Sequence, residues 1–199
     1  MMIDLCHTLN RIPIETSVTQ MILVEPRTNF HALVHLCEKK HHEWKTHSSY
    51  EPFPAVIGEH GIAAVGEKKE GDLKTPAGLY AIGDAFGSKP LALKMDYKYI
   101  TTTDKYIDDP NHPHYNQWIS GETSASSYER MLNPLYQYGA VIQYNQMPVI
   151  PGLGSAIFLH IWRSQDAGTA GCVALQEKNV LKILHWLDKN KHPHIKILS

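Results

Sequence analysis

A histidine and a cysteine lie close together near the C-terminus, in residues 154–175 with the sequence GSAIFLHIWRSQDAGTAGCVAL. His160 falls in a strand-like run, and Cys172 follows twelve residues later. A thiol that passes its proton to an imidazole becomes a nucleophile for carbonyl carbons and forms an acyl-thioester. Gly171 leaves the backbone before the thiol open, and the amides near Cys172 could stabilise an oxyanion. The pair indicates covalent acyl chemistry; the alternative is a hydrogen-bonded strand histidine and an ordinary buried thiol.

A charged segment upstream supplies candidate substrate contacts. Glu70, Asp72 and Lys74 lie in residues 66–78, GEKKEGDLKTPAG, which have no apolar period and predict a surface loop. These groups could bind the charges of a substrate, or they could be solvated residues of a loop whose shape is set by Gly71 and Pro76.

Three further residues are candidates through their place near His160. Tyr144 and Asn145 end the strand predicted before it, where they could present polar groups at the same end of the sheet. Trp162 is two residues after His160 and therefore on the same strand face, where it could wall the pocket. A core tyrosine, a turn asparagine and a core tryptophan are the alternatives.

Histidine and cysteine usage gives no sign of a metal centre. The thirteen histidines include scattered clusters without neighbouring cysteines, a pattern that favours exposed loops over a zinc site. Three cysteines are too few for a disulfide scaffold, and at least one must be a free thiol.

The elements that must position these residues are mainly strands. Apolar runs bounded by Gly and Pro predict strands at residues 19–26, 29–36, 54–57, 79–82, 139–144, 156–162 and 195–198. Residues 104–134 are broken by Asp-Pro, His-Pro, Gly and Asn-Pro and are predicted to be mostly irregular. One helix is predicted around residues 180–187, ended by His192-Pro193. The fold class is therefore mainly β with one C-terminal α-helix.

Composition excludes several classes of protein. The chain has 199 residues, 43% hydrophobic and 20% charged, which fits one globular domain. A net charge of −1 gives no electrostatic case for a nucleic-acid partner. No run approaches the ~18 apolar residues of a membrane span, and the N-terminus lacks the basic and apolar regions of a secretory signal.

The stretch around Cys172 resembles the signature of the YkuD-type L,D-transpeptidases, in a branch with the pattern TAGCxAL. Further segments follow in the order typical of that branch: Glu70-Gly71-Asp72, residues 74–78 (KTPAG), Asp108-Asp109, Tyr115-Asn116, Tyr144-Asn145 and Gly154-Ser155. The resemblance covers residues 55–187. The chain departs from the commonest family pattern, in which an Arg shortly after the Cys helps to bind substrate, since Val173, Ala174 and Leu175 stand here.

The resemblance implies a β-sandwich and a role for each site residue. Cys172 corresponds to the nucleophile and His160 to the general base, while Thr169 and Gly171 help to form the site. A backbone carbonyl near the cysteine commonly orients the histidine in this family, so Thr169 or Ala170 is expected to supply it. No metal or organic cofactor is implied.

The implied activity is acyl transfer on peptidoglycan stem peptides by a monomer. Hydrolysis of the thioester would make the protein an L,D-carboxypeptidase, and a silent wall-binding module is the alternative outside enzymes. The family implies the cell envelope or periplasm, whereas the missing export signal favours the cytoplasm. Residues 51–199 are expected to form the catalytic domain, with residues 1–50 as an extension or hairpin in the same domain.

Overall fold

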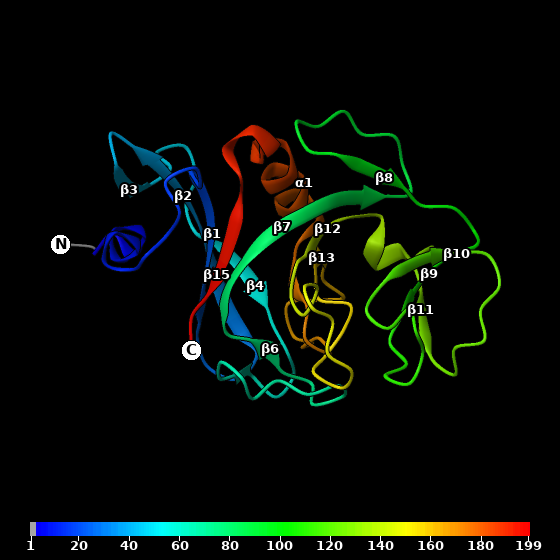
Figure 1. Cartoon of the computed structure of the whole chain (residues 1–199). Helices are drawn as coiled ribbons and strands as arrows, with labels where there is room; N and C mark the ends of the chain where they lie inside the picture. The colour runs from blue at the N-terminus through cyan, green and yellow to red at the C-terminus, as the bar shows by residue number, and fades with distance from the viewer. Residues whose placement is uncertain (1–2) are drawn as a thin grey trace.

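The computed structural model describes residues 3–199 and is built around one large sheet (Figure 1). The sheet closes on itself, because β1 pairs with both β15 and β2. Its strands follow in the order β1 (Gln20–Pro26), β15 (His194–Ile197), β7 (Gly78–Gly87), β12 (Tyr138–Ile142), β13 (Phe158–Ile161), β14 (Val173–Leu175), β4 (Phe53–Val56) and β2 (His31–Lys40). β3 (Glu43–Thr46) pairs with β2, and β8 (Tyr97–Tyr99) pairs with β7. The mainly β, sandwich-like fold class predicted from the sequence is confirmed.

The continuous apolar run of β1 exists because both of its faces are buried. Ile22 and Val24 point into the central core, and Met21 and Leu23 point into a second cluster beside the N-terminal segment. A strand covered on both faces has no reason to alternate with polar residues.

The single α-helix in residues 3–199, α1 (Glu177–Trp186), packs against β12, β13 and β14. Val180, Ile183, Leu184 and Leu187 repeat at helical spacing and are fully buried in the central core. The predicted end at His192-Pro193 is wrong. Leu187 already has extended backbone (φ −60°, ψ 138°), and Asp188 caps a separate 3-10 turn, η3 (Lys189–Lys191). The buried Leu187 and this cap end the helix before the proline is reached.

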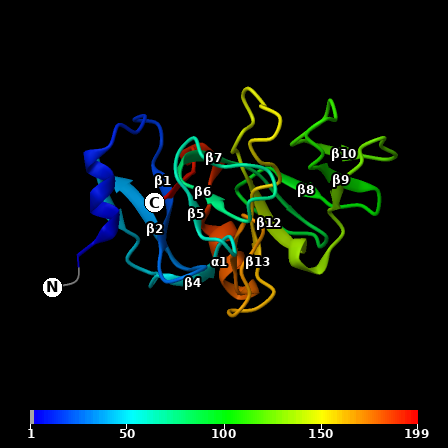
Figure 2. The same cartoon turned by 90° about the horizontal axis from the view of Figure 1, so that it is seen from below.

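Residues 104–134 are mostly irregular, as predicted, but they also contain a small sheet. β9 (Asp104–Ile107) pairs with β10 (Trp118–Ser120) on one side and β11 (Tyr128–Arg130) on the other. The sheet itself was not predicted, because strands of three or four residues are too short to show a period. This sheet lies beside the main sheet (Figures 1 and 2), and a second apolar core unites Phe86, Phe158, the 3-10 turn η2 (Pro134–Tyr136) and Cys172.

Residues 3–50 contribute β1, β2 and β3 to the same sheet. The 3-10 helix η1 (Leu5–Arg11) is joined to β2 by a disulfide between Cys6 and Cys37. β2 pairs directly with β4, so strands on either side of residue 50 share one sheet. The wide spacing of the cysteines did not predict this disulfide; Cys172 is the free thiol.

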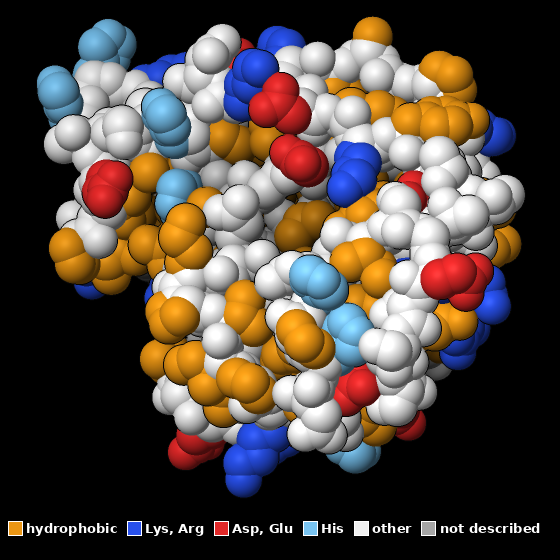
Figure 3. All heavy atoms as spheres, turned by 45° about the vertical axis from the view of Figure 1, so that its right-hand side comes forward, with side chains coloured by type: hydrophobic (Ala, Val, Ile, Leu, Met, Phe, Trp, Pro, Cys, Tyr) orange, Lys and Arg blue, Asp and Glu red, His pale blue; other side chains and the backbone are white. Residues whose placement is uncertain are grey.

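The segment predicted as a surface loop, residues 66–78, is folded inward at several points. Lys68 and Thr75 are 4% and 0% exposed, and β6 (Thr75–Pro76) pairs with β5 (Ile62–Ala63). The surface-loop prediction failed for these residues because Thr75 hydrogen-bonds to Gly58 and Lys68 to Asp72, contacts that composition does not reveal. On the face shown in Figure 3, charged side chains of both signs are scattered among apolar and uncharged groups.

Candidate active site

Cys172 lies immediately before β14, at the junction of the main sheet and the small one. Its thiol donates to the carbonyl oxygen of Ala156 at 3.2 Å, and its sulfur accepts from the N–H of Phe158 at 3.3 Å. The residue is 7% exposed. The thiol is therefore held in place by the backbone that leads into β13.

His160 lies on β13, on the same face as Cys172. β13 and β14 run parallel, with His160 opposite Ala174, so Cys172 is offset by two residues along the neighbouring strand. Such a diagonal pair has backbones roughly 7 Å apart, within reach of the two side chains. The ring of Tyr136 lies edge-on to both His160 and Phe158, with centroids 5.1 and 5.4 Å apart, which confirms the shared face.

The carbonyl that orients His160 is its own neighbour's. Nδ1 lies 2.7 Å from the oxygen of Ile161. Because a carbonyl oxygen only accepts, Nδ1 carries the proton in this contact. The carbonyl of Leu135 also contacts the ring, and both carbonyls oppose the lowering of the His160 pKa by burial. The expectation that Thr169 or Ala170 would supply this carbonyl is wrong, since β13 ends at Ile161 and the chain turns its carbonyl back towards the ring.

Thr169 and Gly171 shape the turn before Cys172. The Thr169 hydroxyl donates to the carbonyl oxygen of Cys172 at 2.7 Å and accepts from the Gly171 N–H at 3.0 Å. Gly171 has φ +147°, and a Cβ there would lie 3.0 Å from the Lys74 oxygen. The Gly171 amide is thus engaged in the turn, and Thr169 holds the backbone of Cys172.

Burial favours the neutral forms of both Cys172 and His160. It raises the pKa of Cys172 from 9.0 to about 12, an effect strengthened by the charge of Glu129. Burial also lowers the pKa of His160 from 6.5 to about 4. The resting pair is therefore a thiol and a neutral imidazole, and proton transfer must accompany attack on a substrate.

Both groups line one cavity of about 820 Å³. Four acidic residues share its wall: Glu59, Glu70, Asp108 and Glu129. Glu129 accepts from the Tyr136 hydroxyl, and burial together with the charges of Asp108 and Glu70 raises its pKa. The cavity therefore offers a negative wall near the thiol, with Tyr136 between Glu129 and the His160 ring.

Motif residues between positions 116 and 156, although up to forty residues apart in the sequence, are joined by hydrogen bonds in the structure. Asn116, 1% exposed, donates to the carbonyls of Tyr144 and Asn145 and accepts from the N–H of Ala156, the residue whose carbonyl holds the thiol. Asn145 in turn donates to the Gly154 carbonyl at 3.0 Å.

Tyr144 and Asn145 therefore support the site from outside the cavity. Neither lines the cavity, and Tyr144 donates its hydroxyl to the Leu153 carbonyl at 2.5 Å. Their expected contact with substrate has no counterpart in the geometry, because Asn116 and the turn 150–154 already occupy their polar groups.

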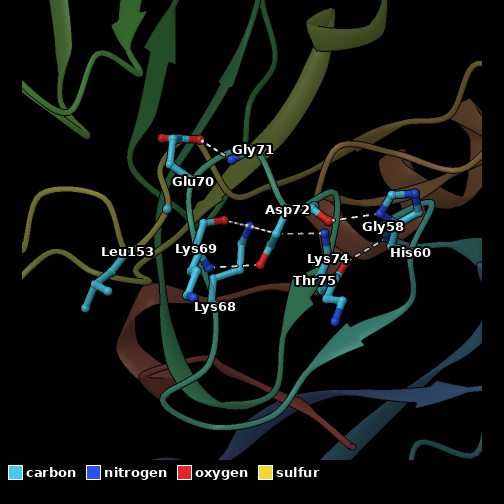
Figure 4. Close-up of polar contacts among 12 residues, drawn as sticks. Gly58, His60, Lys68, Lys69, Glu70, Gly71, Asp72, Lys74, Thr75 and Leu153 are labelled. Carbon is cyan, nitrogen blue, oxygen red and sulfur yellow. Dashed lines mark hydrogen bonds and ion pairs between the residues drawn. The ribbon is translucent and has the colours of Figure 1, made fainter.

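Glu70, Asp72 and Lys74 separate into different roles. Glu70 lines the cavity and accepts hydroxyl hydrogen bonds from Tyr115 and Ser155. Asp72 accepts from the Lys68 ammonium and from the N–H groups of residues 69 and 74 (Figure 4). Although burial raises the pKa of Asp72, these hydrogen bonds lower it below its usual value. Asp72 and Lys74 do not line the cavity; Asp72 fixes the loop instead.

Trp162 is directed away from the cavity. It lines a separate hollow with Tyr50, Gln165 and Asn179, whereas the next residue, Arg163, lines the cavity of Cys172. The expected shared strand face fails because β13 ends at Ile161, so strand alternation no longer governs Trp162.

The sequence did not single out Lys68, Glu129 or Tyr136, although all three line the cavity. Each comes from a segment distant from Cys172, and local pattern carries no signal of that contact. Among residues 3–199, no group of three or more His, Cys, Asp or Glu is arranged to hold a metal ion.

Comparison with known families fits this geometry. The family model of the L,D-transpeptidase catalytic domain, YkuD, matches residues 30–195, and the chain belongs to this family of peptidoglycan-acting enzymes. Searches of curated proteins and of solved structures gave no significant match. No helix within residues 3–199 is long and apolar enough to cross a membrane.

Proposed function

We propose that this protein is a cysteine acyltransferase that crosslinks peptidoglycan stem peptides through a thioester on Cys172. The observation that carries the proposal is that the free thiol of Cys172 and the imidazole of His160 line one cavity, with His160 on β13 and Cys172 directly before the neighbouring strand β14. A thiol and a base in reach of one reacting atom are the requirements for nucleophilic acyl transfer.

In the first half-reaction, His160 takes the thiol proton as the sulfur of Cys172 attacks a stem-peptide carbonyl. The tetrahedral intermediate collapses with cleavage of the C–N bond to the terminal D-residue. That residue leaves as an amine with the proton carried by His160. The products are the free D-residue and a thioester on Cys172.

In the second half-reaction, the amine of another stem attacks the thioester carbonyl and gives a proton to His160. The C–S bond breaks, the sulfur recovers its proton from the imidazolium, and a new amide joins the stems. If water attacks instead, the same steps give hydrolysis and an L,D-carboxypeptidase. A cationic acceptor amine would find the carboxylates of Glu70 and Glu129 in the cavity wall, which favours the crosslinking reaction.

We further propose an envelope location and a monomeric enzyme. The Cys6–Cys37 disulfide supports the location, because disulfides persist in oxidising compartments.

The test is incubation of a purified disaccharide-tetrapeptide with the protein and with Cys172→Ala, followed by mass spectrometry. The proposal expects a crosslinked dimer whose mass is that of two substrates minus one free terminal D-amino acid. This product should be absent with the variant. Loss of the D-residue alone would assign the carboxypeptidase. No turnover together with an unreactive Cys172 would favour a silent wall-binding module.

A further inference from the structure

A lysine side chain is buried in the wall of the catalytic cavity. Lys68 is 4% exposed and lines the cavity together with Gly171 and Cys172. Its stem packs against Gly154, where an added Cβ would come within 3.2 Å of the lysine Cγ and Cε. Lysine is almost never fully buried unless its charge is paired, so the position of this ammonium requires an explanation.

The pairing of Lys68 is incomplete. Its Nζ donates to Asp72 Oδ1 at 2.5 Å and to the carbonyl oxygen of Lys69 at 2.9 Å (Figure 4). An ammonium has three N–H donors, and within residues 3–199 the third has no acceptor. Asp72 also accepts from two backbone amides, so its charge is shared with them.

The Lys68 ammonium lies close to the turn that leads into Cys172. Its Nζ would be 3.8 Å from a Cβ placed on Gly171, the residue directly before Cys172. The positive charge also lowers the pKa of the Cys172 thiol against the opposing effect of burial. Arg130 and Arg163 line the same cavity, but both are exposed. Lys68 is therefore the desolvated cation nearest the reacting atoms.

We propose that Lys68 forms a carboxylate-binding subsite beside Cys172, which holds the C-terminal carboxylate of the donor stem peptide. This inference rests on the proposed function for the identity of the donor. The terminal D-residue ends one residue after the attacked carbonyl, about 3.8 Å further along the chain. A carboxylate at that distance from the sulfur reaches the free donor of Lys68, and a charge-assisted hydrogen bond fixes the donor's direction in the cavity.

The first test uses alkylation of Cys172 and needs no peptide substrate. The rate ratio of anionic iodoacetate to neutral iodoacetamide is measured for the protein, Lys68→Met, Lys68→Arg and Lys69→Met. Lys69 is the matched control, because it is exposed on the same loop and outside the cavity. We expect the ratio to fall at least fivefold in Lys68→Met only. An unchanged ratio in folded Lys68→Met overturns the proposal.

A second test requires no variant and covers the case in which Lys68→Met does not fold. N-acetyl-D-alanine should protect Cys172 of the unaltered protein from iodoacetamide at concentrations where N-acetyl-D-alanine amide does not. Equal protection by both, or none by either, contradicts the subsite.

A third test joins the subsite to the reaction. Tetrapeptide donors ending in a free carboxylate should exceed the corresponding amides in kcat/KM by about tenfold or more, the value of a hydrogen bond to a charged group. Equal rates overturn the proposed subsite. If neither donor reacts, the proposed function fails, while the two alkylation tests still decide whether Lys68 binds carboxylates.

Discussion

Replacing Asn116 by alanine should disturb the backbone that supports Cys172, although Asn116 does not itself line the cavity. The Asn116 side chain makes three hydrogen bonds, to the carbonyls of Tyr144 and Asn145 and from the N–H of Ala156, at 2.8 to 3.0 Å. The residue is 1% exposed, so the groups left behind gain little from water. Its φ of +58° is tolerated by asparagine and costs alanine about 1 kcal/mol.

The expected loss follows from these contacts. Three hydrogen bonds at about 1 kcal/mol each, together with the backbone cost, give about 4 kcal/mol. A domain of ordinary stability, about 5–15 kcal/mol, would remain folded but weakened. Ala156 would also lose the contact that fixes its carbonyl against the Cys172 thiol, so the alkylation rate of Cys172 should change as well.

The assay is urea unfolding of Asn116→Ala beside Asn111→Ala, whose side chain is exposed. The control should stay within about 0.5 kcal/mol of the unaltered protein. A loss below about 1 kcal/mol in Asn116→Ala, with an unchanged alkylation rate, would show that Asn116 does not hold the backbone that supports Cys172.

Three further predictions concern the disulfide and the charges of the site. Cys6→Ser should lower the free energy of unfolding by about 4 kcal/mol, because the lost crosslink spans 31 residues, with Cys172 alkylation unchanged; a loss below about 1 kcal/mol would count against it. Burial lowers the pKa of His160 from 6.5 to about 4, so the neutral imidazole stabilises the fold above pH 6.5. Roughly 3 kcal/mol of this folding free energy is lost as the pH falls from 6.5 through 4. Urea midpoints of His160→Gln should show a weaker pH dependence over this range, and parallel curves would contradict the assignment. Glu129→Gln should speed Cys172 alkylation at pH 8 about fivefold, because its charge raises the thiol pKa; a slower rate would show that Glu129 has another role.

The proposed catalytic pair could be singled out from the sequence because its signals are local. His160 and Cys172 lie in strand-like, glycine-bounded segments close together in the chain, and the resemblance assigned their roles. Their placement in one cavity follows from the parallel pairing of β13 with β14.

The remainder of the site depends on contacts between distant segments. Lys68 lines the cavity beside Cys172 although it is more than a hundred residues away in the sequence. Glu129, which accepts from the Tyr136 hydroxyl, lies on a strand too short to show a period. Tyr144 and Asn145 were expected near the site, and the structure places them behind it, because Asn116 binds their carbonyls. Trp162 left the predicted strand face because the strand ends one residue earlier.

The proposed thioester on Cys172 can be detected directly from the mass of the protein during turnover. The protein is mixed with disaccharide-tetrapeptide, quenched in acid, and mapped by peptide mass spectrometry, with Cys172→Ala as the control. The account predicts an adduct equal to the donor minus its terminal D-residue, attached to Cys172 and absent from the variant. An adduct on another residue, or product formation that persists in Cys172→Ala, would contradict it.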